Sequence, residues 1–160
     1  MTYSMILSRT SQYAVQALIY MATQPPGAPV LNKDIAVKLN VPAPYLAKIL
    51  QGLAKGNLLY SFRGRTGGFC LREDGGKINL MDIIQQTEGP NFTQSCLLGL
   101  KKCSDETACP LHFRWVPVKE KVIDLLQETS LEKLAKAVES GKYRLADLPG
   151  DMFPRPADQQ

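Results

Sequence analysis

The sequence predicts a mainly α-helical protein with a small β-hairpin wing, a winged helix-turn-helix followed by a long dimerisation helix. Three observations support this fold class. An amphipathic helix over Ala43–Lys55 follows a short helix and a tight turn, and a glycine-rich basic hairpin comes next at residues 58–72. Apolar residues from Leu111 to Leu125 then step by 4, 3, 4 and 3 positions. A chain of 160 residues, 44% of them apolar, can bury one core and carry a helical extension.

The first two helices are predicted from capping residues and apolar spacing. Ser8 or Thr10 can cap a helix over Ser11–Thr23, in which apolar residues recur at helical spacing at Ala14, Ala17, Leu18 and Met21. Asn32 can cap a short second helix, and a tight turn at residues 40–42 ends it.

The helix over Ala43–Lys55 has the clearest pattern in the chain. Leu46, Ile49, Leu50 and Leu53 form its apolar face, and the opposite face carries Pro44, Lys48, Gln51 and Lys55. Small, cationic and amide side chains on such a helix are typical of a recognition helix in the DNA major groove. An ordinary amphipathic surface helix would show the same pattern, so the hairpin that follows is needed to favour the recognition helix over it.

The hairpin consists of two expected strands, at residues 58–62 and 69–72, around a glycine-rich turn with Arg63 and Arg65. Glycines permit positive φ and close backbone approach, while the arginines could contact phosphates or enter a minor groove. A nucleotide-binding loop is the alternative, but no helix start or GK[ST] motif follows these glycines. A DNA-contacting wing is the better interpretation. Cys70, in the second strand, is expected to be a small packing residue.

A polar loop holds three of the four cysteines, spaced C-x6-C-x5-C, and the only histidine lies three residues after the last of them. Thiolates and imidazole suit iron–sulfur clusters or zinc. If Cys109 caps a helix that begins at Pro110, the Cys109 sulfur and the His112 ring face the same small volume. The candidate ligands are therefore Cys96, Cys103, Cys109 and His112.

Two other interpretations of these cysteines stay open. Structural zinc usually has tighter C-x(2–4)-C knuckles, which the sequence lacks. A disulfide would suit an oxidising compartment, but no signal peptide is recognisable at residues 1–20. We therefore expect a reduced, cytoplasmic protein.

The C-terminal half is predicted to be helical on either side of this loop. A short helix is expected at Asn79–Thr87, and a long helix, running to about Glu128, has a seam suited to pairing with a second subunit, formed by Trp115, Val118, Val122 and Leu125. Pro117 either kinks that helix or begins it. Ser130 can cap a last helix over Leu131–Ser140.

The domain organisation follows from these elements. We expect a winged helix-turn-helix at residues 1–90, a cluster-binding loop at 91–110, dimerisation helices at 110–141 and a flexible tail at 142–160. Residues 1–80 hold nine Lys and Arg against three Asp and Glu, whereas residues 81–160 hold ten against twelve. A basic first half favours a polyanionic partner. No apolar run approaches the roughly 20 residues of a membrane helix, so no membrane partner is expected.

With these motifs in place, the chain resembles the Rrf2 family of bacterial transcriptional regulators. The resemblance covers residues 5–137 and is carried by LSRTSQYAVQAL, PYLAKILQGLAKGNLL, SFRGRTGGFCL, CLLGLKKCSDETACPLHFRW and LQETSLEKL. It implies a homodimer that binds a partly palindromic double-stranded DNA operator and an iron–sulfur cluster whose state changes DNA affinity. It also implies that Cys96, Cys103 and Cys109 ligate the cluster, with His112 matching the histidine ligand of the IscR-like branch.

The resemblance favours a 2Fe-2S cluster, with 4Fe-4S as the alternative. The nitric-oxide-sensing, NsrR-like branch takes a carboxylate ligand from the first helix, and the matching residue here, Gln12, is a poor ligand. The family's usual spacing is C-x5-C-x5-C, so one extra residue separates Cys96 from Cys103; a single insertion in a flexible loop costs little closure entropy.

These features predict a DNA-binding repressor or dual regulator that senses redox, iron or cluster status. The first alternative is a regulator of the same fold without a cluster, which responds through thiol chemistry, a metabolite or a protein partner, as in cysteine-metabolism regulators. A thiol or metal enzyme is disfavoured because no nucleophile motif or second catalytic constellation is found.

Overall fold

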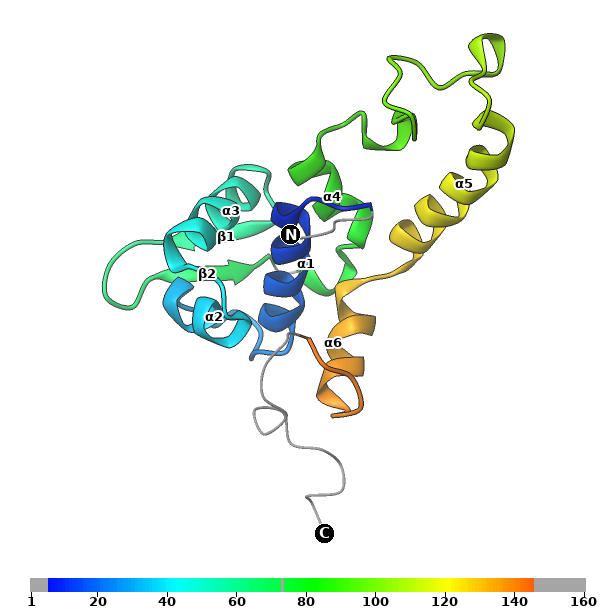
Figure 1. Ribbon diagram of the computed structural model, residues 1–160. Helices are drawn as coiled ribbons and strands as arrows, with labels where there is room; N and C mark the ends of the chain where they lie inside the picture. The colour runs from blue at the N-terminus through cyan, green and yellow to red at the C-terminus, as the bar shows by residue number, and fades with distance from the viewer. Residues whose placement is uncertain (1–5, 73, 146–160) are drawn as a thin grey trace.

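The computed structural model describes residues 6–72 and 74–145. In it, helices precede and follow one two-stranded antiparallel sheet, in the expected order along the chain. The elements are α1 (Arg9–Ala22), α2 (Asn32–Leu39), α3 (Ala43–Lys55), β1 (Leu59–Phe62), β2 (Gly68–Leu71), α4 (Leu80–Glu88), α5 (His112–Glu128) and α6 (Leu131–Glu139). Short 3-10 turns lie at Gly75–Lys77, Phe92–Gln94 and Asp105–Thr107. The predicted fold class is confirmed. Figure 1 shows α1 to α4 and the hairpin gathered together, with α5 and the loop before it extending away from them.

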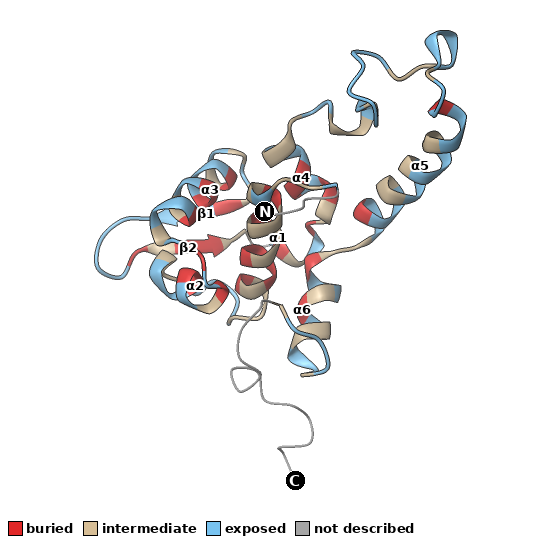
Figure 2. Ribbon diagram, in the orientation of Figure 1, coloured by how far each residue is buried: buried red, intermediate tan, exposed pale blue. Residues whose placement is uncertain are grey.

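The main core forms around α1, whose apolar stripe is fully buried at Ala14, Ala17 and Leu18. The apolar face of α3 packs against it, with Leu46 and Leu50 at 0% exposure. A second, smaller cluster joins α4 to the end of α5 through Met81, Ile84 and Leu126. Figure 2 shows the contrast: buried residues concentrate where the N-terminal helices meet, while α5 is mostly exposed.

The first helix is capped by Ser8, whose hydroxyl accepts a hydrogen bond from the Ser11 N–H at 3.2 Å. Thr10 is therefore not the cap; its hydroxyl is hydrogen-bonded to that of Tyr45 on α3, 2.7 Å away. At the start of α4, Asn79 and Asp82 form a reciprocal capping box.

The prediction that Asn32 caps the second helix is wrong, because α2 already includes Asn32 and its N-cap is Leu31. The Asn32 side chain instead donates to the carbonyl of Ala43 at 2.9 Å, which ties the start of α2 to the start of α3. The turn between these helices passes through Asn40, which adopts a left-handed conformation with φ of 53°. This arrangement fixes α3 relative to α2 as a helix-turn-helix.

The predicted start of the long helix is also wrong. Helix α5 begins at His112 with Leu111 as its N-cap, and residues 110–111 form a turn in which the His112 N–H donates to the Cys109 carbonyl at 3.0 Å. Cys109 thus contributes its backbone to this turn, and its sulfur does not cap the helix. Pro117 lies inside α5, so it does not begin the helix.

The predicted helical seam on α5 is largely unburied by the rest of the chain. Val118 and Leu125 are 49% and 62% exposed, and Trp115 and Val122 are half-buried. Only the C-terminal half of the helix packs on the body of the molecule, where Val122 and Ile123 lie against the α4 cluster. The last helix, α6, is capped by Ser130 as predicted. The predicted tail covers residues 142–160, and its part from residue 146 onward lies outside the described residues.

Candidate DNA-binding surface and metal centre

The outward face of α3 presents the side chains that the sequence assigns to DNA. Its apolar face is buried in the core, so Pro44, Lys48, Gln51 and Lys55 are all exposed on the opposite side. A Gln amide can bond an adenine edge bidentately, and a Lys ammonium can bond a guanine edge or a phosphate.

The hairpin beside α3 places its two arginines at the tip. Strands β1 and β2 pair from Leu59–Leu71 to Phe62–Gly68, and Arg63 and Arg65 are exposed in the connecting turn. Gly68 has φ of 133°, and a Cβ there would overlap the Val30 backbone, because Val30 and Phe69 exchange two backbone hydrogen bonds. This close approach anchors the wing to the loop before α2. Cys70 is buried in β2, as predicted.

Sequence patterns did not reveal the contribution of α1 to this surface. Tyr45, 36% exposed near the start of α3, bonds Thr10 and meets the Tyr13 ring edge-on at 5.8 Å. Arg9, also exposed, lies over the Tyr13 ring at 5.3 Å. The first turn of α1 therefore adds a cation and hydroxyls beside the recognition helix. Residues 35 positions apart have no periodic signal that could link them.

The cysteine loop runs from Gly89 to Leu111 and contains only single 3-10 turns. All three of its cysteines are free and half-buried. Three leucines in it, Leu97, Leu98 and Leu100, are more than half exposed. So much exposed apolar surface in a polar loop is what a contact with another molecule would cover.

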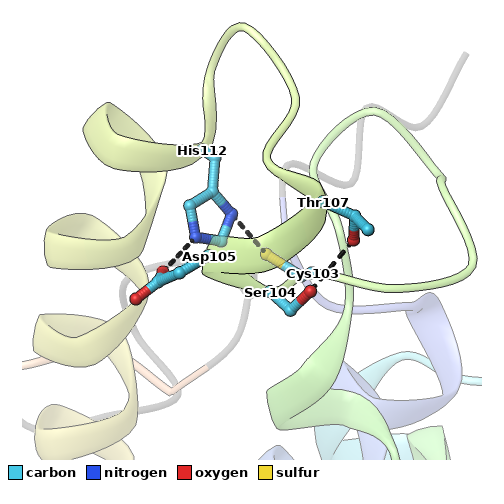
Figure 3. Close-up of polar contacts among 5 residues, drawn as sticks. All are labelled: Cys103, Ser104, Asp105, Thr107 and His112. Carbon is cyan, nitrogen blue, oxygen red and sulfur yellow. Dashed lines mark hydrogen bonds and ion pairs between the residues drawn. The ribbon is translucent and has the colours of Figure 1, made fainter.

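His112 connects the loop to the long helix. The ring is 2% exposed, its Nδ1 lies 3.4 Å from the Cys103 sulfur, and its Nε2 lies 2.7 Å from an Asp105 carboxylate oxygen (Figure 3). Because the carboxylate can only accept, Nε2–H donates to it, and in the neutral imidazole Nδ1 is then the nitrogen with the lone pair, on the side of the sulfur. Asp105 itself is 85% exposed in its side chain. The carboxylate thus fixes the orientation of the ring, as carboxylates do for histidines that bind metals.

The other two cysteines form a separate pair. Hydrogen bonds from the backbone of Leu100, and then from the backbone of Leu98, the Cys109 side chain and the backbone of Gly99, outweigh the effect of burial and hold the pKa of the Cys96 thiol below its ordinary value. Gly99, with φ of 75°, makes the turn in which its own N–H donates to the Cys96 carbonyl at 3.0 Å. A lowered thiol pKa favours the thiolate that metals bind.

The four predicted ligands are thus brought together as two pairs, Cys103 with His112 and Cys96 with Cys109. The expectation that His112 faces Cys109 is wrong, because α5 begins two residues later than the Cys109 cap requires. Within residues 6–72 and 74–145 no three His, Cys, Asp or Glu side chains lie together as a metal-holding group. The donor types fit an iron–sulfur cluster, and the two pairs would have to close on each other to hold it.

The comparisons with known proteins identify the family. Residues 7–137 match the Rrf2 family model, described as an iron-dependent transcriptional regulator. The chain belongs to the Rrf2 family. It is 30% identical over 132 residues to the HTH-type transcriptional regulator IscR of Xenorhabdus nematophila, which covers 82% of this chain and 80% of the relative.

Two solved structures of Rrf2-type regulators are similar to this chain. CymR (YrzC), the global cysteine regulator of B. subtilis, superposes with a TM-score of 0.69 at 26% identity, over 86% of this chain and 98% of that one. T. potens IscR superposes with a TM-score of 0.68 at 27% identity, over 92% of this chain and 96% of that one. The protein is therefore a transcriptional regulator with a DNA-binding helix-turn-helix, not an enzyme. The described helices include none that is long and apolar enough to cross a membrane.

Proposed function

We propose that this protein is a homodimeric transcriptional regulator whose affinity for operator DNA is set by an iron–sulfur cluster bound to Cys96, Cys103, Cys109 and His112. The observation that carries the proposal is the buried His112 ring held between Asp105 and the Cys103 sulfur. An imidazole oriented by a carboxylate toward a free thiol is the arrangement of a ligand prepared for metal.

The residues present fit a 2Fe-2S cluster. Mixed thiolate and imidazole ligation is known for 2Fe-2S centres and raises their reduction potential. Gln12 offers no carboxylate, and its side-chain amide is engaged inside α1, accepting from Arg9 at 3.3 Å and donating to the Leu7 carbonyl at 3.4 Å. When bound, the cluster would supply a redox couple that thiols and imidazole alone do not have. The 4Fe-4S alternative would need a fourth ligand other than Gln12.

Hydrogen bonds connect the end of α4, which directly precedes the cysteine loop, to the recognition helix through the start of α1. The loop starts immediately after Glu88, whose carboxylate accepts from the Ser8 N–H at 2.7 Å and from the Ser11 hydroxyl at 2.5 Å at the start of α1. Thr10, next to Ser11 in the chain, forms a hydroxyl–hydroxyl hydrogen bond with Tyr45 on α3. A movement of the loop that shifts Glu88 would therefore be transmitted to α1 and from there to the recognition face.

The exposed seam of α5 is the proposed dimer interface. Val118 and Leu125 on this helix are exposed apolar residues, as are Phe113 at 70% exposure and the three leucines of the cysteine loop, and a second subunit would cover such side chains. Two subunits paired through α5 would present two recognition helices to the half-sites of a palindromic operator. Substituting Val118 and Leu125 with Glu should give a monomer by sedimentation, with operator binding weakened.

Absorption spectroscopy of anaerobically purified protein, with iron and acid-labile sulfide assayed on the same sample, tests the proposal. Equal iron and sulfide with visible absorption that C103A removes and C70A leaves intact would support it. C70A is the matched control because Cys70 lies in β2, outside the loop. Protein without iron, sulfide or colour even after reconstitution would contradict the cluster proposal but leave DNA binding intact.

A second candidate function is a regulator that responds through its thiols alone. It is favoured by the hydrogen bond between the Cys96 and Cys109 thiols, which is one of the causes that lower the pKa of the Cys96 thiol. Two-electron oxidation of these thiols by a peroxide would form one disulfide and release two water molecules. Mass spectrometry of peroxide-treated apo protein would detect a Cys96–Cys109 disulfide; its absence would exclude this candidate.

A further inference from the structure

A further concave site shares two of its lining residues, Tyr60 and Arg72, with the hollow beside the recognition helix, and no residue of the cysteine loop lines it. A pocket of about 680 Å³ is enclosed by the end of α1 and the loop that follows it, by the two wing strands, and by α6. Its volume is within the range of about 300–1,000 Å³ that small-molecule sites occupy. None of the predicted DNA contacts or metal ligands lines it.

The floor and one wall of this pocket are apolar. Met21, Cys70 and Ala135 line the pocket and are only 4–6% exposed, so they form a buried apolar part of its lining, called the floor here. On the β1 wall stand two aromatic rings, Tyr60 and Phe62, which are 40% and 48% exposed. Exposed aromatic rings beside a buried apolar floor are suited to the apolar part of a ligand.

The charges around the rim are arranged asymmetrically. Directly after β2, Arg72 lies over the Tyr60 ring at 4.6 Å and forms no ion pair with any described residue. On α6, Glu132 and Glu139 flank a single cation, Lys136, which pairs with Glu132 at 2.6 Å. Glu132 and then Glu139 hold the pKa of Lys136 above its ordinary value. Among the described residues, the wing wall thus has a cation without an ion pair and the α6 wall has one more carboxylate than cations.

We propose that this pocket binds a zwitterionic molecule with an apolar side chain, an amino acid or short apolar peptide. Its carboxylate would pair with Arg72, its ammonium group with the acidic side chains of α6, and its side chain would cover the apolar floor. A zwitterion matches both walls, whereas a simple anion would meet the surplus carboxylate and a simple cation would meet Arg72.

The site would link such a ligand to DNA binding through the wing. Tyr60, Phe62 and Arg72 belong to or adjoin the strands that carry the exposed arginines, and α6 follows directly after the proposed dimer helix. A bound ligand would hold the hairpin against α6 and restrict its orientation. The site itself depends neither on a cluster nor on the proposed dimer.

Isothermal titration of the full chain with L-methionine, L-phenylalanine and leucyl-leucine tests the proposal, with N-acetylmethionine and methionine amide as probes that each lack one charge. We expect at least one zwitterion to bind, and its affinity to fall roughly tenfold or more in R72Q, since hydrogen bonds to charged groups are the strong ones. A135F should block the floor. K133A is the control, because Lys133 is exposed on α6 but does not line the pocket.

Three results would overturn the inference. One is the absence of binding by all three zwitterions at millimolar concentration. Another is unchanged affinity of R72Q for the zwitterions; because Arg72 is partly exposed, this variant should fold normally. The third is binding only after removal of residues 146–160, because the chain's own C-terminal segment would then be the occupant. These titrations contain no DNA and no iron, so their outcome is independent of the proposed regulatory function.

Discussion

The salt dependence of DNA binding tests the proposed interface most directly. Four cations are exposed on α3 and the wing tip, and they are Lys48, Lys55, Arg63 and Arg65. The perturbation is the double substitution R63A/R65A, which removes both wing cations without touching the core or the recognition helix.

The expected magnitude follows from counterion release. If every one of these cations in a dimer contacts a phosphate, the slope of log K against log[salt] is about −7, at roughly −0.9 for each phosphate neutralised. Affinity would then fall by about 10⁴ between 50 and 200 mM salt. The double substitution halves the number of cations, so it should reduce the slope to about −3.5 and the loss of affinity to about 10².

Fluorescence anisotropy with a labelled duplex from the protein's own promoter region, measured from 50 to 300 mM KCl, gives the slope. K121A serves as the control, because Lys121 is exposed on α5, which extends away from the wing (Figure 1). A slope in R63A/R65A equal to that of the wild type would refute the placement of the wing on DNA. A slope reduced equally by K121A would show a non-specific effect of net charge.

Three further substitutions, E88Q, L50A and G68A, test the fold, the last two each with a control substitution. E88Q should reduce the free energy of unfolding at pH 7 by about 1 kcal/mol after allowance for partial exposure. Burial opposes ionisation of Glu88, but hydrogen bonds from Ser11 and Ser8 outweigh it and lower its pKa. The ionised Glu88 side chain therefore stabilises the fold above the ordinary pKa of about 4.3, and this stabilisation is lost as the pH falls through the lower pKa of the folded state. E88Q should flatten the acid side of a curve of unfolding free energy against pH, measured by urea unfolding. An unchanged curve would contradict this. L50A should cost about 2–5 kcal/mol in the same assay because Leu50 is fully buried, while V37A, at a 68% exposed position, should cost little; equal effects would contradict the assigned core. G68A should cost about 1–3 kcal/mol and loosen the wing because of its positive φ, whereas G52A, with open space around its Cα, should not destabilise α3, and thermal melts of both would show no difference if the strain is absent.

The amino-acid sequence by itself determined the helices, the wing and the outward-facing residues of α3. Apolar residues at helical spacing must be buried together, and this leaves Lys48 and Gln51 on the exposed side whatever the helix packs against. Of the predicted caps, Ser130 and one of the two candidates for α1, Ser8, are confirmed, whereas Asn79, expected as the first residue of its helix, is the N-cap of α4. These signals are local, so they survive without knowledge of the tertiary structure. The four candidate ligands could likewise be selected by side-chain chemistry alone.

Only the tertiary structure decided which of these residues meet. The His112 ring lies against Cys103 and Asp105, and because the turn at residues 110–111 delays the start of α5, the arrangement expected from a Cys109 cap does not form. Thr10 bonds a tyrosine on another helix, and the pocket behind the wing is formed by segments up to about a hundred residues apart. Such pairings depend on the path of the whole chain in space, and a pattern of period 2 or 3.6 contains no information about that path.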